Sequence, residues 1–492
     1  MSVRTVAAVL GGMFLACCFA ASVDPRVDPD LFHGLTLARE FVATGSLPRR
    51  DVFAYTPTHP LVVHHEWLSG TLAYLVVERF GGGGLTALAL ALEALLVAAA
   101  LLLACWQGAR LPTLCLLAPL GLALVAPGLT TLRAQVWSLL CTTLVLAWLR
   151  LDRLGRRWWI VPFLLVHVVW LNLHGGFVIG PALLVLHAAE QRLRGRPVGH
   201  LVFAVVVACG LIVVNPYGPA YLAYLRDALT MDRSLIAEWR PLGDGYPAAL
   251  VAWGLSVTVL AYGVARRGVR DADGVLLVVA TAVLALRHQR HVSIYAVVWL
   301  AQVPPLVGRS PLGALVRRWW VESPRCVAVV MSLAIAWAAS RAWAVAPWRL
   351  AVPTQPHAGA VVFPVGAVAY LAAQEFHGHL MTPFEVGAFV SWKLHPDVQV
   401  SLDGRYEAAF DHQLVVEHVV FYGAVPGWGA VRAKYATDAV LVPADAPIAS
   451  VLQAEAAWPL VYEDDAYRIY ARPGLALPVV DGRGRVPIGS FP

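Results

Sequence analysis

Eleven long apolar runs are the feature of this sequence that most constrains its fold. The chain is 59% hydrophobic and only 14% charged, whereas an average soluble domain has about 25% charged residues. Each run approaches the length needed to cross a hydrocarbon core of about 30 Å. The eleven runs lie near 5–22, 84–106, 112–128, 133–150, 158–173, 175–190, 199–214, 246–265, 273–287, 291–308 and 325–345. They predict a polytopic α-helical membrane protein with about 11 transmembrane helices.

Arginine sets the expected orientation, because short loops rich in arginine stay on the cytoplasmic side. The loops expected there carry Arg110, Arg150, Arg153, Arg156, Arg157, Arg192, Arg194, Arg196, Arg266, Arg267, Arg270, Arg309, Arg317 and Arg318. The run Leu68–Phe80 breaks this alternation if it spans, so we expect it to lie in the outer interface as an amphipathic helix. The N-terminus is then cytoplasmic and the C-terminus outside. We favour a retained first span over a signal peptide cleaved near Ala20-Ala21-Ser22.

Composition also excludes some classes of function. The net charge of +6 is spread over short loops, and no basic run has the length of a nucleic-acid surface. The seven cysteines lie in or beside apolar runs without the spacing of a metal site. We therefore expect no nucleic-acid partner and no cysteine-bound metal.

The composition changes near residue 349. Val398, Val400 and Leu402 alternate with polar residues, as in a half-buried strand. Asp438–Pro443 reads as a second strand, and Leu460–Glu463 with Tyr467–Arg472 reads as a hairpin. Helices are expected over 365–377 and 406–421. We predict a transmembrane domain over 1–348, with a first outer loop at 23–83, and a C-terminal extracytoplasmic α/β domain over 349–492.

Polar groups from distant segments fall on the outer side in this topology. A carboxylate at the membrane surface can take a proton from an acceptor hydroxyl as it attacks a sugar carbon, and Asp28 and Asp30 are the candidates. The alternative for Asp30 is the N-cap of a helix over Leu31–Val42. His65 and Glu66 are candidates for the acceptor pocket; interface anchoring by Trp67 is equally favoured, and a metal site is a weaker alternative.

A second group of residues suits a phosphate. Arg287, His288, Arg290 and His291 offer cationic donors at the outer end of one span, and Arg133 is a further candidate. The alternative is that these side chains reach lipid headgroups.

Three other residues are candidates for the sugar pocket. Asn172 and His174 precede two glycines, and a hydrogen-bonded helix end is the alternative for them. Glu238 stands beside Trp239, so a carboxylate and an aromatic face could bind sugar. Asp403-Gly404-Arg405-Tyr406 reads as a turn with an ion pair, and the Asn215-Pro216-Tyr217-Gly218 turn is assigned no role.

The pattern resembles the GT-C superfamily of membrane glycosyltransferases, which use polyprenyl-phosphate-linked sugars. The resemblance is carried by Asp30, Ala38-Arg39-Glu40, Gly45 to Pro48, and the Trp67 helix with Gly81. Aminoarabinose transferases and protein mannosyltransferases have a similar first outer loop. Trp170–Gly176, Glu238-Trp239, Arg287-His288 and Asp403-Gly404-Arg405 look like a bacterial branch with a soluble outer tail. This sequence has Asp-Pro-Asp-Leu where many members have Asp-Glu, so either Asp28 or Asp30 could be the base.

The resemblance implies an inverting glycosyltransferase in the bacterial inner membrane. Its expected partners are a polyprenyl-phosphate sugar donor, membrane lipids and an acceptor that the sequence does not name. No cofactor is assigned, and dependence on a divalent metal is left open. The alternatives are a transporter or flippase of a lipid-linked substrate, or an inactive GT-C relative that acts as a binding protein. Against transport, no internal repeat is visible in the sequence.

Overall fold

The described part of the chain forms two compact units. The computed structural model describes residues 2–131, 133–233, 236–245, 247–355, 361–455, 457–485 and 491. A helical unit contains Met1–Pro25, Thr86–Asn215 and Arg233–Leu350. An α/β unit contains Arg26–Leu85, Pro216–Asp232 and Ala351–Pro492. The boundary predicted at residues 348 and 349 stays a prediction; the structure adds that the C-terminal stretch shares its compact unit with two earlier segments.

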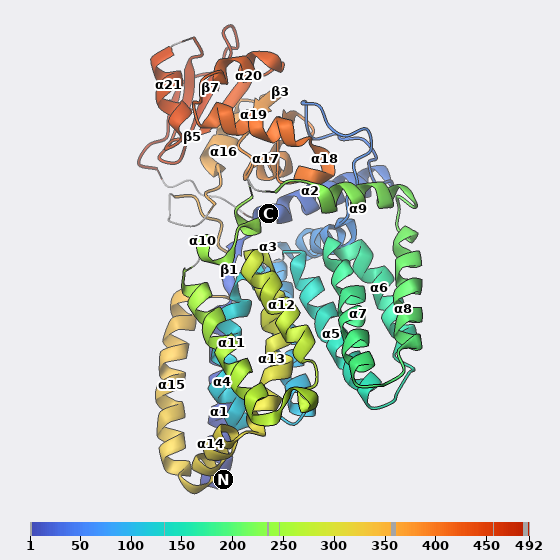
Figure 1. Ribbon diagram of the computed structural model, residues 1–492. Helices are drawn as coiled ribbons and strands as arrows, with labels where there is room; N and C mark the ends of the chain where they lie inside the picture. Colours follow the sequence, from blue (N-terminus) through green and yellow to red (C-terminus); the bar gives the residue numbers. More distant parts are fainter. Residues whose placement is uncertain are drawn as a thin grey trace. The chain divides into compact units, whose positions relative to one another are not determined.

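Long apolar sequences form the helical unit (Figure 1). In lipid, a helix satisfies every backbone hydrogen bond within one segment, which suits such runs. Its helices are α1 (Val3–Ser22), the later part of α3 (Trp67–Trp106), α4 (Leu111–Val125), α5 (Gln135–Arg153), α6 (Ile160–Leu173), α7 (Ile179–Leu193), α8 (Gly199–Gly210), α10 (Leu242–Gly245), α11 (Pro247–Arg267), α12 (Val275–Arg287), α13 (Val292–Gly308), α14 (Pro311–Glu322) and α15 (Pro324–Val345). Short elements between them are η1 (Ala126–Gly128), β2 (Thr130–Thr131), η2 (Gly175–Val178), η3 (Leu211–Val213), η4 (Ala237–Trp239), η5 (Val269–Asp271) and η6 (Gln289–His291).

Helix α13 forms the centre of this unit. Every residue from Val292 to Gly308 is buried, and the helix packs against α4, α5, α11 and α12. Small residues allow this close packing: a Cβ on Gly121 of α4 would lie 2.3 Å from a methyl carbon of Leu300. Helix α1 packs against α15 and α4.

The predicted apolar runs all fall on helices. Among the described residues, six helices are long and apolar enough to cross a membrane: Val3–Ser22, Trp67–Trp106, Leu111–Gly128, Pro247–Arg267, Gln289–Gly308 and Pro324–Val345. Three shorter apolar helices are Ile160–Leu173, Gly199–Val213 and Val275–Arg287. The chain is thus a multi-pass membrane protein, and the count of eleven spans stays a prediction.

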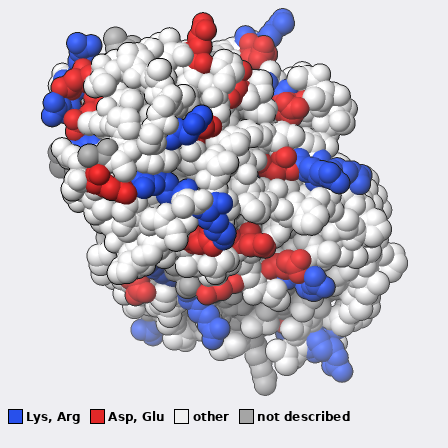
Figure 2. Space-filling view, turned by 90° about the horizontal axis from the view of Figure 1, so that it is seen from above, with Lys and Arg blue, Asp and Glu red and all other residues white. Residues whose placement is uncertain are grey.

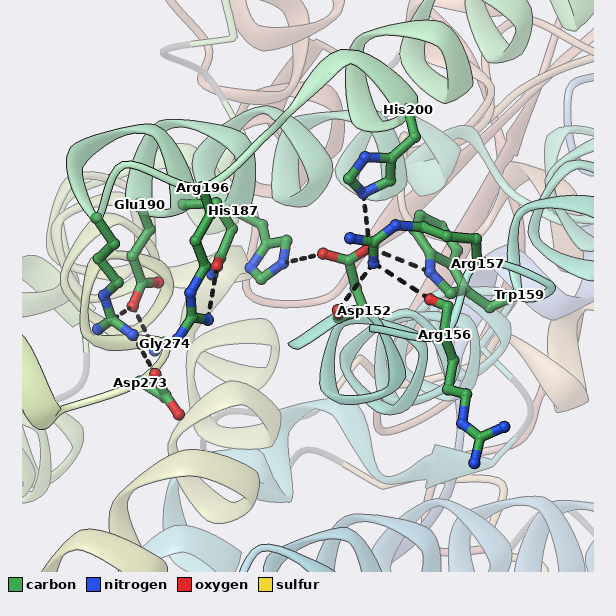
Figure 3. A network of polar contacts seen from close by, with 12 residues as sticks. Asp152, Arg156, Arg157, Trp159, His187, Glu190, Arg196, His200, Asp273 and Gly274 are labelled. Atoms are coloured by element: carbon green, nitrogen blue, oxygen red, sulfur yellow. Dashed lines mark hydrogen bonds and ion pairs between the residues drawn. The ribbon is translucent and has the colours of Figure 1, made fainter. Parts of the chain in front are cut away.

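Asp152 joins several helices of this unit at the end of α5 (Figure 3). Its carboxylate is 3% exposed. It accepts hydrogen bonds from His187 Nε2 at 3.0 Å, His200 Nε2 at 2.7 Å and Arg157 Nη1 at 2.7 Å. Trp159 Nε1 adds a fourth donor at 3.3 Å. One carboxylate thereby ties α5 to α7, to α8 and to the start of α6.

The α/β unit contains a mixed six-stranded sheet in the order β4-β3-β5-β7-β6-β8. β3 runs parallel to β4 and β5, β7 runs antiparallel to β5 and β6, and β8 runs parallel to β6. The strands are β3 (Gly378–Met381), β4 (Val398–Val400), β5 (Ala439–Pro443), β6 (Leu460–Glu463), β7 (Tyr467–Ala471) and β8 (Val480–Asp481). The helices are α16 (Val365–Ala373), α17 (Gly387–Leu394), α18 (Tyr406–Ala409), α19 (His412–Tyr422), α20 (Trp428–Lys434) and α21 (Pro447–Glu455).

The sequence predictions for this sheet are confirmed where alternation was clear. β4, β5 and the β6–β7 hairpin fall on the predicted segments. The helix predicted over 406–421 is divided by Phe410 and Asp411 into α18 and α19. β3 and α17 were not predicted.

The first loop contains β1 (Asp24–Val27), which crosses the boundary between the units, and then α2 (Pro29–Thr44) and the start of α3, which belong to the α/β unit. Phe32 of α2 packs edge-on against Phe389 and Phe363, with ring centroids 5.0 and 5.2 Å away. Arg39 donates to the backbone oxygens of Trp392 at 3.0 Å and His395 at 3.2 Å. These contacts explain the Ala38-Arg39-Glu40 motif: the loop helix is a structural part of the α/β unit.

Two glycines set how α2 crosses the start of α3. A Cβ on Gly70 would lie 2.7 Å from the carbonyl oxygen of Gly34, so the backbones meet where neither residue has a side chain. Helix α3 is broken at Gly81, which has φ 61° and ψ −158°. The break separates the predicted interfacial segment Leu68–Phe80 from the apolar run that follows.

Candidate active site

Asp28 and Asp30 lie at the beginning of α2 in different roles. Asp28 is the N-cap, and its carboxylate accepts a hydrogen bond from the backbone N–H of Asp30 at 3.0 Å. Pro29 follows at the first helical position, where it needs no hydrogen-bond partner. The alternative interpretation of Asp30, as the cap of a helix starting at Leu31, is therefore wrong, because the Asp-Pro pair starts the helix two residues earlier. Asp30 lies in the first turn.

Asp30 lies against the turn at Gly404. A Cβ on Gly404 would be 3.1 Å from Asp30 Oδ1. The next residue, Arg405, has a side chain that is 1% exposed. Its Nε donates to both oxygens of Asp403, at 2.8 and 3.0 Å, and its Nη1 pairs with Asp51. The predicted turn with an ion pair is confirmed, and it lies beside the candidate base.

Two histidines that sequence reasoning did not select lie in the same region. The rings of His33 and His64 stack with centroids 5.6 Å apart. Burial lowers the pKa of His64 to about 3, with a further contribution from the positive charge of Arg405. Burial and Arg405 also hold the pKa of His33 well below its usual value. Both imidazoles are therefore neutral at pH 7.

The sequence spacing indicates a place near Asp30 for His33 but not for His64. His33 follows Asp30 by three residues, which places both on one face of α2. His64 is 2% exposed, and neither of its ring nitrogens has a hydrogen-bond partner among the described residues. Nothing in the His64-His65-Glu66 sequence distinguishes the buried histidine from its neighbour.

His65 and Glu66 lie at the edge of this region. His65 Nδ1 is 2.8 Å from the Tyr224 hydroxyl on α9 (Ala220–Thr230), and its Nε2 is 3.4 Å from Glu66 Oε1. The backbone N–H of His64 donates to the Tyr217 hydroxyl at 3.1 Å. Tyr217, which the sequence suggested was only a turn residue, thus supports the histidine segment.

The predicted phosphate-binding residues form a separate group within the helical unit. Arg133 pairs with Glu238 through both of its terminal nitrogens, the second at 2.8 Å from Oε2. Burial opposes ionisation of Glu238, but Arg133 and then Arg290 lower its pKa. The sequence put Arg133 in the phosphate site and Glu238 in the sugar pocket; the structure joins them as one ion pair.

Trp239 is the centre of this group. The guanidinium groups of Arg233 and Arg290 lie 4.6 and 5.1 Å from its ring centroid. His288 Nδ1 donates to the backbone oxygen of Trp239 at 2.7 Å, which fixes the orientation of its ring. The ring of His291 lies 5.9 Å from Trp239, whereas Arg287 is exposed. We call Arg133, Glu238, Trp239, Arg287, His288, Arg290 and His291 the Arg–His group.

Asn172 and His174 have structural hydrogen bonds at the end of α6. Asn172 Nδ2 donates to the backbone oxygen of Val214 at 3.2 Å. His174 Nδ1 lies 2.6 Å from the Ser138 hydroxyl and 2.9 Å from the Gly176 N–H. A Cβ on Gly176 would lie 2.5 Å from Ser138 Oγ, so glycine is needed there. These bonds fit the hydrogen-bonded helix end that was the alternative to a pocket role.

Charged side chains of both signs are scattered over the face seen in Figure 2, often with a basic group next to an acidic one. Among the described residues, no group of three or more His, Cys, Asp and Glu side chains could hold a metal ion. A requirement for a divalent cation stays untested.

Comparison with solved structures identifies the fold. No protein-family model matches the chain, and no curated protein matches it. The structure is similar to an oligosaccharyltransferase from Archaeoglobus fulgidus in the apo form, with a TM-score of 0.58 and 11% identity over 97% of this chain and 75% of that one. The chain has a GT-C fold. The oligosaccharyltransferase AglB from Archaeoglobus fulgidus, in complex with an inhibitory peptide and a dolichol-phosphate, has a TM-score of 0.57 and 11% identity over 95% of this chain and 75% of that one.

A third structure with the GT-C fold is ArnT from Cupriavidus metallidurans, bound to undecaprenyl phosphate. It has a TM-score of 0.48 and 14% identity, covering 96% of this chain and 99% of that chain. The fold assignment rests on the two archaeal structures, and at 11% identity they establish the fold alone.

Proposed function

We propose that this protein is an inverting glycosyltransferase, which moves a sugar from a polyprenyl-phosphate-linked donor to an acceptor hydroxyl. The observation that carries the proposal is the position of Asp30 in a chain with a GT-C fold. Its carboxylate lies in the first turn of α2, against Gly404 and beside the buried Arg405 ion pairs. Similar solved structures include enzymes bound to dolichol-phosphate and undecaprenyl phosphate.

Asp30 acts as the base in this proposal. Its carboxylate takes the proton as the acceptor oxygen bonds to the anomeric carbon, while the bond from that carbon to the phosphate oxygen breaks. Attack from the face opposite the phosphate inverts the anomeric centre, and polyprenyl phosphate leaves with the electron pair. Asp28 is less suited to this role because it caps α2. Neutral His33 and His64 do not compete with the acceptor hydroxyl as proton donors.

The Arg–His group is our candidate for binding the donor phosphate. Arg290 and Arg287 carry positive charge, and His288 can donate through Nε2 when protonated. Arg133 is held by Glu238, so we assign it to positioning Glu238 and Trp239. Asn172 and His174 support the neighbouring helix end, and His65 and Glu66 border the acceptor.

The first experiment identifies the donor and tests the base. Mass spectrometry of the lipid that copurifies with the full-length protein names the donor, and release of polyprenyl phosphate from that lipid measures turnover. We expect Asp30→Asn to reduce turnover by about 10²-fold or more. Asp28→Asn is the matched control, because asparagine is an equally good N-cap; its turnover should stay within a few-fold of wild type.

Several outcomes would contradict the proposal. A folded Asp30→Asn protein with near wild-type turnover would exclude Asp30 as the base. Lipid-linked sugar that crosses vesicle membranes without being cleaved would favour a flippase. A protein that binds the donor but neither cleaves nor moves it would be an inactive relative.

Localisation and domain roles belong to the same proposal. The arginine distribution supports a bacterial inner-membrane protein with a cytoplasmic N-terminus, in which residues 349–492 form an extracytoplasmic domain. The acceptor would then be a lipid, glycan or protein of the cell envelope.

A further inference from the structure

One end of the helical unit holds two acids that pair with the same arginine (Figure 3): Glu190, which is 6% exposed, and Asp273, which is 40% exposed. Arg194 Nη2 lies 2.8 Å from Glu190 Oε1, and its Nη1 pairs with Asp273. The backbone N–H of Gly274 donates to the same Glu190 oxygen at 2.8 Å. Both carboxylates thus pair with Arg194, while Glu190 Oε2 is buried without a hydrogen-bond partner in the described part of the chain.

Arg153, in the last turn of α5, is a nearby arginine without such a partner. Its Nε and Nη2 atoms are buried and have no hydrogen-bond acceptor among the described residues. Its Nη1 is 3.5 Å from Gln107 Oε1, at the limit of a hydrogen bond. Burying a guanidinium without an acceptor costs free energy. A bound ligand that supplies acceptor atoms is the simplest explanation for the burial of Arg153.

Further unpaired donors lie around Arg153. A Cβ on Gly274 would lie 2.9 Å from Gln302 Oε1 and 3.1 Å from Arg153 Nη2, so these side chains meet at a residue that leaves them room. Gln302 Nε2 and Arg150 Nε are also buried without an acceptor in the described part of the chain. Arg150 precedes Arg153 by one helical turn, on the same face of α5. The unmet groups on these three side chains are all donors.

The local charge is positive. Arg153 interacts electrostatically with Arg150 and Arg194 as well as with both acids, and Arg309 interacts with Arg150 and Asp273. Arg309 is exposed and donates to the backbone oxygen of Gln107 at 2.7 Å. Arg196 also interacts with Asp273, so at least five arginines of the described chain lie near these two carboxylates. Arginines that only mark a cytoplasmic loop, such as Arg156 and Arg192, are exposed instead.

We propose that Arg153, Gln302 and Arg150 bind a phosphate group, with Arg309 at the exposed margin. A phosphate offers several acceptor oxygens and matches the planar fork of arginine. The phosphate belongs either to a phospholipid headgroup or to a free anion. The site lies at the ends of α5, α12 and α13 away from the Arg–His group, so it is separate from the proposed donor site.

Thermal unfolding of the purified full-length protein in detergent tests the site. The probes are inorganic phosphate and micelles containing phosphatidylglycerol, with phosphatidylcholine micelles as the reference. We expect phosphatidylglycerol to raise the Tm of wild type by several degrees and to lose this effect in Arg153→Gln. Arg192→Gln removes an exposed arginine from the same end of the unit, and its shift should equal that of wild type.

The outcomes separate the sources and can overturn the site. A shift with phosphatidylglycerol but not with phosphate assigns a lipid headgroup, and equal shifts assign a free phosphate. Equal shifts in wild type and Arg153→Gln, or no shift in wild type, overturn the proposal. If Arg153→Gln fails to fold, Arg153→Lys keeps the charge but loses the fork; its Kd for the effective probe should rise about tenfold, and an unchanged Kd overturns the site.

Discussion

At the scale of single residues, Arg405 is the central residue of the polar interior of the α/β unit. Besides its bonds to Asp403 and Asp51, its guanidinium lies 5.1 Å from the ring of Phe53 and 5.4 Å from that of Phe410. Burial opposes its charge, but the two carboxylates raise its pKa. Burial is the main cause of the lowered pKa of His33 and His64, and the permanent cation at this position lowers the pKa of both further.

Gly404 provides a test of the contact with Asp30. A methyl group in Gly404→Ala would meet Asp30 Oδ1 at 3.1 Å, so the carboxylate must shift by a few tenths of an ångström. We expect donor turnover to fall by about tenfold, because small displacements of a reacting group are costly. Tm should stay near wild type. The control is Gly429→Ala, because a Cβ at Gly429 would have no atom within 4 Å; this variant should leave turnover unchanged. Gly427→Ala is unsuitable as a control because Gly427 has a positive φ.

The histidine pair predicts how stability depends on pH. The pKa of His64 falls from about 6.5 in an unfolded chain to about 3 in the folded protein, so the unfolded chain binds more protons between these values. The contribution of neutral His64 to the free energy of unfolding is therefore fully present above pH 6.5. It is lost as the pH falls toward 3, by up to about 1.4 kcal/mol per pH unit.

Replacing the histidine should remove this dependence. Apparent Tm measured from pH 7.5 to 4.5 should fall less steeply in His64→Phe than in wild type. His377→Ala removes an imidazole that is 65% exposed and should keep the wild-type slope. Parallel slopes for wild type and His64→Phe would mean that His64 is not the group that titrates.

Residue patterns predicted the acid at the start of α2 but not its surroundings. Asp30 and the Asp403–Arg405 turn stand out because they are polar residues beside apolar segments. Their proximity depends on how α2 and the later sheet fold together, which no local pattern records. The roles of Asp28 and Asp30 differ because proline at the first helical position decides which residue is the cap.

At the scale of elements, the carboxylate of Asp152 connects the three helices α5, α7 and α8. His187 is fully buried and its Nδ1 has no partner among the described residues. Its bond from Nε2 to Asp152 therefore fits the neutral imidazole. His200 is 19% exposed and donates to the other oxygen of Asp152. The network holds three helices by directional bonds rather than by apolar packing alone.

Asp152→Asn tests this connection. The amide keeps the shape but loses the charge that Arg157 faces and one of two acceptor oxygens, so we expect a loss of about 3 kcal/mol in the free energy of unfolding. Thermal unfolding in detergent measures it. Asp227→Asn removes a carboxylate that is 60% exposed and pairs with Arg226; it should leave Tm unchanged. An equally stable Asp152→Asn protein would show that packing alone holds these helices.

Elements were predictable where one physical signal dominated. Apolar runs gave the helices, and alternation gave β4, β5 and the β6–β7 hairpin. β3 (Gly378–Met381) was missed because it begins at a glycine with φ 149° and has only four residues. α17 was missed because nearly all its residues are buried, so it has no polar face to show a helical period.

At the scale of the whole molecule, the α/β unit is built from three separate segments of the sequence. It takes in Arg26–Leu85 and Pro216–Asp232 as well as the C-terminal stretch. Sequence composition shows where the apolar runs stop, near residue 349, and it predicted a domain boundary there. It does not show which earlier loops join the later sheet, because those contacts, such as Phe32 with Phe389, are individually ordinary apolar pairs.

Cysteine labelling tests the predicted orientation. Ser450 is exposed on α21, and no cysteine occurs after Cys326. We expect a membrane-impermeant maleimide to label Ser450→Cys in cells whose outer envelope is opened, above the wild-type background. Arg192→Cys, in a loop expected to be cytoplasmic, should react only after the inner membrane is permeabilised. The reverse pattern would invert the proposed topology.

The three-segment composition of the α/β unit also affects how the protein is made. Arg39 and its backbone partner Trp392 are 353 residues apart, which takes about 20 to 70 seconds to translate at 5–20 residues per second. During that interval α2 has emerged from the ribosome while its partner helix does not yet exist. The apolar side chains of α2 must contact lipid or a chaperone during that time, so we expect newly made chains to be most sensitive to proteases before synthesis ends.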